Sequence, residues 1–345
     1  MKRVLACLTL GVALTASAET KVGIIGLDTS HSLAFTKIMN VTKDPRVAGF
    51  RVTAAHQWGS RDIVSATNRY PKYIVQMKEM GVEIVPTVED LLAKVDVVCL
   101  ETNDGREHFW QAEKVFAAGK PVFIDKPIAH NLRDAIRIYE AGRKYGAKYF
   151  SASALRYSKV AKAAHAGEYG RILTAALTSP SPVEEQGTHG FYSWYGIHGF
   201  EPLVAIMGTG VKTVSCFRND DGDVVNAVWA DGRMGQLHLL RKNWNYTGYV
   251  QPEKKPQGWT APSVLFDGYP GYEPLLEQIV TFFKTGVPPV PPEECLEVMA
   301  FMEAAEMSAK RGGAPVTLAE AMDACSRPKM RRTHFAATGV SVFLV

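Results

Sequence analysis

The segment GIIGLDTSHS, residues 23–32, decides how the first half of the chain is interpreted. The apolar residues that open it predict a buried strand, and residues 33–41 follow with the spacing of a helix. A strand, a tight glycine turn and a helix begin a doubly wound α/β fold, whose first turn cradles a dinucleotide. Gly26 takes the first place of the motif G-x-G-x-x-G, but Asp28 and His31 stand where the other two glycines are expected. The turn therefore predicts a dinucleotide-binding architecture with an atypical lining.

Around this turn the chain alternates between strand and helix patterns as far as about residue 150. The predicted strands are at 22–27, 50–55, 83–85, 95–100 and 120–127, and helical patterns separate them. This alternation predicts an N-terminal Rossmann-type domain, a doubly wound parallel sheet over residues 19–150.

The second half changes character. Strand-like runs follow one another with turn residues between them, at 171–179, 211–219, 224–232 and 235–244. Consecutive strands of this kind predict a C-terminal α+β domain over residues 151–330, with an open, mainly antiparallel sheet. Residues 331–345 remain as a C-terminal tail.

The N-terminus has the layout of a secretory signal. Lys2 and Arg3 precede an apolar run, and small residues at 16–18 supply a cleavage site before Glu19. We expect residues 1–18 to be a signal peptide and the mature protein to be exported, either periplasmic or secreted. No other segment is long enough to span a membrane.

Composition and cysteine spacing exclude several classes. A formal net charge of +4 over 345 residues, without a basic block, argues against a nucleic-acid partner. The four cysteines beyond the signal are widely spaced and form no C-x-x-C pair, so the sequence predicts neither a metal site nor a redox pair.

Several stretches together resemble one family. FIDKPIAHN contains Asp125, Lys126 and Pro127, and the helix before it begins near His108. SASALRYS opens the second half, WYGIHGFE contains His198, and GAPVTL closes the sheet. These marks resemble the Gfo/Idh/MocA family, the group of glucose-fructose oxidoreductase and inositol dehydrogenase, over most of the mature chain.

The resemblance implies hydride transfer between NAD or NADP and a sugar, polyol or sugar derivative. It also implies that the domain at 151–330 binds the substrate and that the open face of its sheet pairs subunits into a homo-oligomer. In that scheme His198 takes the proton of the hydroxyl being oxidised, and Lys126 orients and polarises the same oxygen. Both residue types suit these roles, because an imidazole is a base near neutral pH and an ammonium stabilises a developing alkoxide. The resemblance places the cofactor on Gly26, Leu27, Asp28, Thr29, Ser30, His31, Ser60, Arg61, Thr102, Asn103, His108, Asp125 and Pro127.

The substrate-side candidates are Arg156, Tyr157, Trp194, Tyr195 and Glu201. Trp194 and Tyr195 could form a stacking wall for a sugar ring or belong to the core. Many family members have an aspartate one helical turn before the histidine, where this chain has Trp194. Glu201 shares a helical face with His198 and could orient its imidazole instead.

Two features leave alternatives open. Asp28 could accept the free N–H groups at the helix start and fill the anion site, or it could turn outward. Ser60 and Arg61 could hold a 2′-phosphate, which would favour NADP, or form an ordinary polar loop. The rival functions are a carbohydrate lyase or glycosidase, with a retained nicotinamide or none, and a non-catalytic sugar-binding protein.

Overall fold

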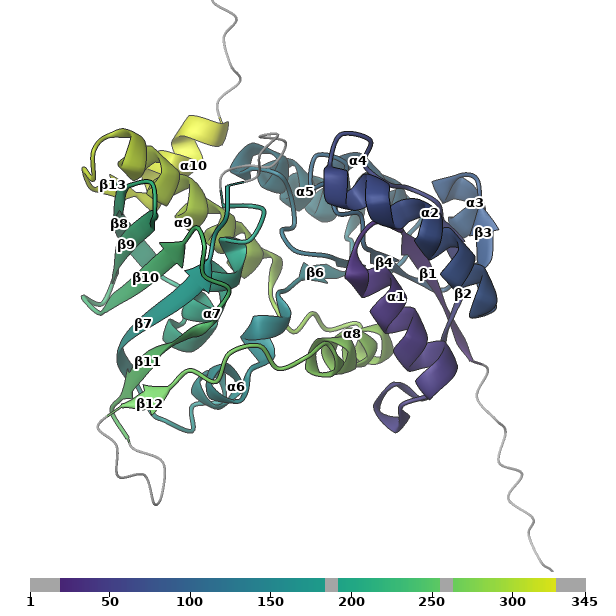
Figure 1. The fold of residues 1–345 in the computed structure, drawn as a ribbon, viewed down its shortest axis with the longest axis horizontal. Helices are drawn as coiled ribbons and strands as arrows, with labels where there is room; N and C mark the ends of the chain where they lie inside the picture. Colours follow the sequence, from purple (N-terminus) through teal and green to yellow (C-terminus); the bar gives the residue numbers. More distant parts are fainter. Residues whose placement is uncertain (1–18, 184–191, 255–262, 327–345) are drawn as a thin grey trace, which may run out of the picture.

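The computed structural model describes residues 19–183, 192–254 and 263–326 of the chain. The predicted signal peptide and the tail at 331–345 lie outside the described residues. The described part forms two sheets, one from each half of the chain, with helices around and between them (Figure 1).

The first sheet has six strands in the order β3-β2-β1-β4-β5-β6, and every pair of neighbours is parallel. Its strands are β1 (Thr20–Ile25), β2 (Phe50–His56), β3 (Glu83–Val85), β4 (Val97–Leu100), β5 (Val122–Ile124) and β6 (Tyr149–Ser151). This is the doubly wound order in which the chain reverses direction at β1, so the predicted Rossmann-type sheet is confirmed.

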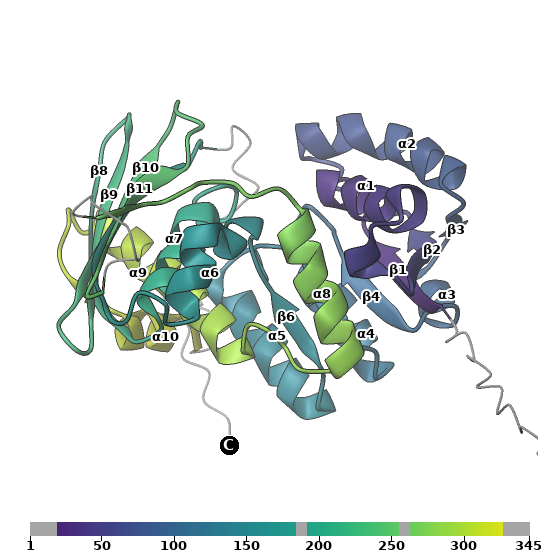
Figure 2. The ribbon, with the colours of Figure 1, turned by 90° about the horizontal axis from the view of Figure 1, so that it is seen from below.

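Helices cover both faces of this sheet (Figure 2). They are α1 (Ser30–Thr36), which continues as a π-helix over Lys37–Thr42, α2 (Val64–Glu79), α3 (Val88–Leu92), α4 (His108–Ala117) and α5 (Leu132–Tyr145). All four residues of β4 are buried, as its continuous apolar run predicts. The Asn131 side chain caps α5 by accepting the Asp134 N–H at 2.9 Å, which explains where that helix begins.

The second sheet has seven strands in the order β12-β11-β7-β10-β9-β8-β13. They are β7 (Ile172–Pro180), β8 (Val211–Arg218), β9 (Gly222–Trp229), β10 (Met234–Leu240), β11 (Thr247–Pro252), β12 (Val264–Leu265) and β13 (Val316–Thr317). All pairs are antiparallel except β7 with β10, so the prediction of a mainly antiparallel sheet is confirmed.

The helices of the second half lie on the side of this sheet that faces the first sheet (Figure 2). They are α6 (Lys159–His165), α7 (Ile197–Met207), α8 (Glu273–Thr285), α9 (Pro292–Lys310) and α10 (Leu318–Ser326), and a 3₁₀ turn at Ala154–Tyr157 precedes them. Residues along the sheet alternate between buried and accessible, because only one face packs on helices.

Helix α8 joins the two halves. It comes late in the chain but packs beside the first sheet, where Phe283 stacks on Phe50 and Phe282 meets Phe150 edge to face. The buried apolar residues of both halves form one continuous core. Among the described residues, no helix is long and apolar enough to cross a membrane.

Candidate active site

A cavity of about 240 Å³ lies where the carboxyl ends of the first sheet's strands meet the second half of the chain. Parallel strands present their following loops at one edge, which is where doubly wound folds bind ligands. The cavity is lined by Thr29, Ser30, His31, Arg69, Asn103, Asp125, Lys126, Ser153, Ala154, Leu155, Trp194, Tyr195, His198, Tyr246, Tyr269 and Tyr272. It therefore brings both predicted catalytic residues to one place.

Lys126 enters the cavity from the loop after β5. Its backbone N–H donates to the Asp125 carboxylate at 2.7 Å, and the peptide bond to Pro127 is cis. The ammonium lies 5.9 Å from the centre of the Tyr195 ring. A fixed positive charge thus stands at the strand end, where a substrate oxygen can reach it.

His198 comes from the first turn of α7, on the other side of the cavity. Its Nδ1 lies 2.7 Å from the Ser153 hydroxyl. Burial lowers the pKa of the imidazole well below 6.5, and the positive charge of Lys126 lowers it further. His198 is therefore neutral at neutral pH, which is the form that accepts a proton.

Glu201 does not contact His198, although the two share a helix. One oxygen of Glu201 accepts the Ser153 backbone N–H at 2.8 Å, and the other lies 3.8 Å from the Arg156 guanidinium. The expectation that Glu201 orients the imidazole is therefore corrected: the Ser153 hydroxyl does so, and Glu201 holds Ser153.

Aromatic rings form one wall of the cavity. Tyr195 packs edge-on against Trp194 and Trp244, and Tyr246 lies edge-on to His198. Tyr272 comes from the start of α8, where its hydroxyl is 2.9 Å from that of Ser30. Such rings offer apolar faces beside hydroxyl groups, which suits a ligand with both C–H and O–H surface.

The turn after β1 contains Gly26 in a backbone conformation that other residues rarely adopt. Gly26 has a φ of +95°, and a Cβ there would lie 2.5 Å from the backbone of Thr102. Only glycine allows that approach, so Gly26 keeps the role of the first glycine in the dinucleotide motif. Leu27, the next residue, is fully buried and belongs to the core.

Asp28 takes neither of the two orientations that the sequence leaves open. Its oxygens accept the backbone N–H groups of Ser60 and Asn103, each at 2.9 Å. These groups belong to the loops after β2 and β4. The carboxylate therefore connects the two loops that flank β1, instead of accepting the N–H groups at the start of α1. Burial raises the pKa of Asp28 to about 6, while the two N–H donors work in the opposite direction.

The start of α1 consequently remains available to an anion. The Thr29 side chain does not cap the helix, and both Thr29 and Ser30 line the cavity. The buried Thr29 Oγ1 and Asn103 Nδ2 have no hydrogen-bond partner among the described residues. Arg69 reaches the same cavity from α2. Helix N–H groups, free side-chain donors and a cation together suit a phosphate, so these residues fit one end of a dinucleotide.

Besides Asp28, a second set of contacts connects the loops after β2 and β4. The Ser60 hydroxyl lies 2.9 Å from an Asp62 oxygen and 3.2 Å from an Asp104 oxygen, and the Arg106 guanidinium donates to both of those carboxylates. Ser60 is thus fully engaged within the protein and does not line the cavity. Arg61 is exposed and also lies outside it.

Three other cofactor candidates lie behind the cavity wall. The two ring nitrogens of His108 contact the carbonyl oxygens of Thr102 and Ile128, at 2.7 and 3.1 Å. His108 therefore ties the loop after β4 to the loop after β5. Thr102 packs on the glycine turn, and Pro127 lines a small void behind Lys126.

The substrate candidates Arg156 and Tyr157 do not reach the cavity either. Arg156 is buried and forms an ion pair with Glu294, at the start of α9. Tyr157 is buried on a different cavity, beside α6. Arg156 therefore connects the 3₁₀ turn at Ala154–Tyr157 to the start of α9.

Removing the charge of Glu294 is expected to destabilise the fold. Glu294→Gln leaves the buried Arg156 guanidinium without its closest anion, and breaking one side of a buried pair costs about 3–5 kcal/mol. Urea unfolding followed by circular dichroism measures the change. A loss below about 1 kcal/mol, the usual size for an exposed ion pair, would contradict the structural role assigned to Arg156.

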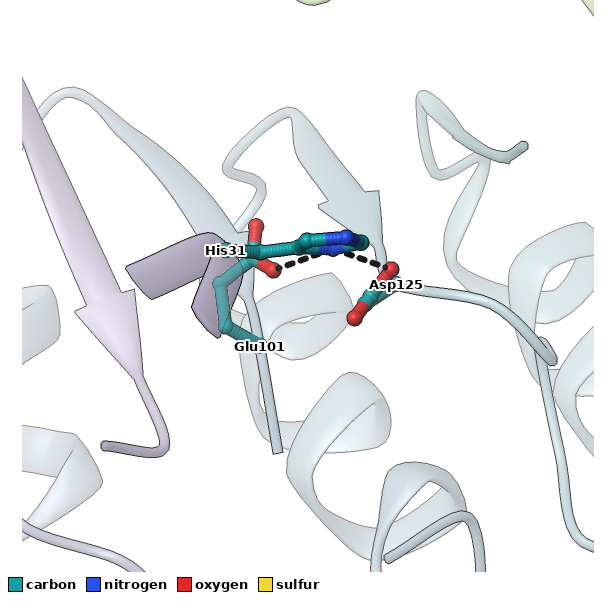
Figure 3. A group of neighbouring side chains, drawn as sticks. All are labelled: His31, Glu101 and Asp125. Atoms are coloured by element: carbon teal, nitrogen blue, oxygen red, sulfur yellow. Dashed lines mark ion pairs between the residues drawn. The ribbon is translucent and has the colours of Figure 1, made fainter. Parts of the chain in front are cut away.

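His31, Glu101 and Asp125 form a buried cluster at one end of the cavity (Figure 3). The His31 Nδ1 lies 2.9 Å from an Asp125 oxygen and 3.7 Å from a Glu101 oxygen. Burial disfavours charge on the imidazole, but the two carboxylates outweigh it and raise the pKa of His31 to about 10. Burial and the Asp125 charge raise the pKa of Glu101 to about 7.

Several lining residues carry no signal in the sequence. They are Arg69, Ser153, Tyr246, Tyr269 and Tyr272. Ser153 lies in the stretch that opens the second half, and its position beside the two predicted site residues could have suggested it. The others come from helices and loops whose packing the sequence pattern does not specify.

Comparisons with known proteins agree with this geometry. Residues 20–153 match the model of an oxidoreductase family with an NAD-binding Rossmann fold, named for Gfo, Idh and MocA. A segment of 59 residues is 44% identical to inositol 2-dehydrogenase of Gluconacetobacter diazotrophicus and covers 17% of this chain. That segment spans only 18% of the relative's length.

Solved structures resemble the chain over most of its length. Scyllo-inositol dehydrogenase from Lactobacillus casei, with bound NAD(H) and scyllo-inositol, has a TM-score of 0.67 at 16% identity and covers 87% of this chain and 99% of its own. An oxidoreductase from Agrobacterium radiobacter, in complex with NAD⁺, L-tartaric acid and magnesium, has a TM-score of 0.66 at 17% identity, covering 88% and 99%. At this identity the likeness establishes the fold. The first half of the chain, residues 20–153, thus matches the NAD-binding Rossmann domain of the Gfo/Idh/MocA oxidoreductase family, and both halves share the fold of these solved structures.

Proposed function

We propose that the protein is an NAD(P)-dependent oxidoreductase that oxidises a hydroxyl of a small cyclic polyol, sugar or sugar derivative. The observation that carries this proposal is the meeting of Lys126 and a neutral His198 in one cavity, at the carboxyl edge of a Rossmann sheet. The family match to an NAD-binding fold supports the choice of cofactor.

Each residue has a role that its surroundings support. His198 accepts the proton of the substrate hydroxyl, and the Ser153 hydroxyl fixes the direction of its ring. Lys126 stabilises the negative charge that develops on the same oxygen. A bound nicotinamide supplies the acceptor for the hydride.

Thr29, Ser30, Asn103 and Arg69 are the residues that would hold the cofactor's phosphates. They offer backbone N–H groups, unpartnered side-chain donors and a positive charge on one side of the cavity. At the position of the second glycine, the Asp28 side chain bonds the loops after β2 and β4.

The lining of the cavity favours a ring with several hydroxyl groups as substrate. Four tyrosines and one tryptophan line it, together with Lys126 and His198. Inositols and monosaccharides combine C–H faces with hydroxyl groups, and a solved scyllo-inositol dehydrogenase shares the fold.

The test is an assay of NAD⁺ and NADP⁺ reduction at neutral pH with a panel of inositols, hexoses and hexuronic acids. We expect turnover with at least one cyclic polyol or sugar, and no reduction with straight-chain alcohols. The exposed pair of Lys114 and Glu89 lies away from the cavity, so Lys114→Gln should leave the rate unchanged. Binding of a sugar without any reduction of either cofactor would favour the non-catalytic alternative.

The pH dependence of kcat/KM should reflect the low pKa of His198. A histidine whose pKa lies below 6.5 stays neutral, and hence active, to lower pH than an ordinary one, so the acidic limb should fall below pH 6.5. In Lys126→Met that limb should move to higher pH, because one cause of the lowered pKa is removed. An acidic limb at or above pH 6.5 in the wild type would contradict the assignment.

Replacing Asp28 should strengthen cofactor binding. Asp28→Gly removes a carboxylate close to the expected phosphates and frees the N–H groups of Ser60 and Asn103, so affinity for NADH should rise about 10- to 100-fold. Because the pKa of Asp28 is about 6, wild-type affinity should fall as pH rises through 6, and that of the variant should not. Fluorescence titration of NADH measures both effects. Equal or weaker binding by a folded variant would show that Asp28 does not border the phosphates.

Two further properties belong to this proposal. We infer that the protein is exported, because residues 1–18 have the pattern of a secretory signal; N-terminal sequencing of the mature chain should begin at Glu19.

We also infer a homo-oligomer through the open face of the second sheet, where Phe217, Met234 and Leu265 are exposed. Light scattering that gives the mass of one chain would contradict the second inference.

A further inference from the structure

The cluster of His31, Glu101 and Asp125 combines ligand types that bind metal ions, and each comes from a different strand end. His31 lies in the first turn of α1, which follows β1, Glu101 directly follows β4, and Asp125 directly follows β5. One nitrogen and one oxygen from each carboxylate lie within 4.8 Å of one another. Figure 3 shows the imidazole lying between the two carboxylates.

The distances match the spacing of donors around one ion. With bonds of about 2.0–2.1 Å to nitrogen and oxygen, the donors of a tetrahedral ion lie about 3.3 Å apart. The two separations from the His31 Nδ1, 2.9 and 3.7 Å, lie on either side of that value. The third separation, between the two carboxylate oxygens, is no more than 4.8 Å.

Glu101 supplies an independent observation that points to a ligand. Its side chain is fully buried, and neither oxygen has a hydrogen-bond partner among the described residues. A buried carboxylate without a donor is costly, and native proteins pair such groups or use them to bind metals. Asp125 differs, because it accepts the Lys126 N–H. Its ion pair with His31, at 3.7 Å, is longer than a hydrogen bond, so Glu101 is the member of the cluster that the protein satisfies least.

We propose that His31, Glu101 and Asp125 bind one divalent cation at the edge of the active-site cavity. A set of one imidazole and two carboxylates suits ions of the zinc and manganese class. Three protein ligands leave a coordination position open, as in catalytic metal sites. Because His31 and Asp125 line the cavity, that position faces it, and a water molecule or substrate hydroxyl would complete the coordination. The cation would also balance the two buried negative charges.

This inference does not rest on the proposed oxidoreductase activity, and its test uses the metal alone. Full-length mature protein is treated with a chelator and titrated with Zn²⁺, and separately with Mn²⁺, by calorimetry without nicotinamide or sugar. We expect one site for at least one of the two ions. Loss of a second-shell residue weakens metal sites 10- to 100-fold, so Glu101→Gln, which removes a ligand charge, should weaken binding by about 100-fold or more.

Glu89→Gln is the matched control, because Glu89 forms an exposed ion pair far from the cavity, and its metal affinity should equal that of the wild type. The metal should also raise the melting temperature of the wild type and the control, but not that of Glu101→Gln. His31→Gln provides a second ligand variant with the same expected loss, should Glu101→Gln fail to fold. Absence of a site for both ions in the wild type, or unchanged affinity in the folded ligand variants, would overturn the proposal. The three residues would then form only a network of buried ion pairs.

Discussion

Replacing His198 by alanine is expected to lower kcat by about 10²- to 10⁴-fold, the range that a positioned general base contributes. The side chain reaches the cavity from the first turn of α7, and its Nδ1 is held by Ser153 at 2.7 Å. Burial and the Lys126 charge keep the imidazole neutral, so the wild type has the base in its active form at neutral pH. Without it, the substrate hydroxyl must lose its proton to water.

The matched control for this variant is His165→Ala, at the exposed end of α6, which should keep the wild-type rate. Steady-state kinetics with the best substrate of the panel measures both variants. A positioning variant adds a finer test: Ser153→Ala should lower kcat more than it changes KM, because the base remains but loses its fixed direction. Near wild-type turnover in folded His198→Ala would remove the general base from this account.

Replacing Lys126 by methionine is expected to lower kcat by about 10²- to 10³-fold, which is the cost of removing one donor that stabilises a developing oxyanion. Methionine keeps much of the length of lysine and removes the charge. The ammonium lies beside Tyr195 at the end of β5, across the cavity from His198. Since its charge also lowers the pKa of His198, the same variant should move the acidic limb of the pH profile upward.

The exposed Lys94, paired with Glu83 on the surface, provides the control, and Lys94→Met should have unchanged kinetics. The two readouts of Lys126→Met separate the catalytic role from a structural one. A rate loss without a shift of the pH profile would mean that Lys126 does not act on His198. A shift without a rate loss would mean that the oxygen's charge is stabilised elsewhere.

The sequence pattern predicted the architecture because periodicity reports burial directly. Continuous apolar runs correspond to the parallel strands, and alternating runs correspond to the sheet that is open on one face. Strands β6, β11 and β12 were not predicted, since β6 has only three residues, β11 contains Gly248 and Pro252, and β12 has only two residues. The parallel pairing of β7 with β10 was also beyond the pattern, because periodicity does not specify which strands are neighbours.

The site was predicted in part, for a similar reason. Lys126, His198, Trp194 and Tyr195 were recognised from motifs, and the structure brings them into one cavity. Glu201 was considered as a residue that could orient His198, because helical spacing places the two on one face, but that spacing does not show which loop lies between them. Ser153 occupies that place.

The contacts of Asp28, and the cluster of His31, Glu101 and Asp125, join segments that are far apart in the sequence, and a sequence motif does not contain such contacts. The two orientations considered for Asp28 both involved its own turn, whereas its actual partners, Ser60 and Asn103, follow two other strands. His31, Glu101 and Asp125 likewise come from three strand ends that meet only in the folded sheet. Spacing along the chain therefore gave no sign of a cation site.

The central claim is that the turn from Gly26 to His31, with Arg69 and Asn103, accepts the phosphates of an external nicotinamide dinucleotide although Asp28 occupies the second glycine position. Native mass spectrometry of the purified mature protein with NAD⁺, NADP⁺ or their reduced forms tests it most directly. The account predicts one dinucleotide per chain, with greater occupancy in Asp28→Gly at the same concentration. A chain that carries none of the four cofactors at millimolar concentration, in both the wild type and the glycine variant, would contradict it.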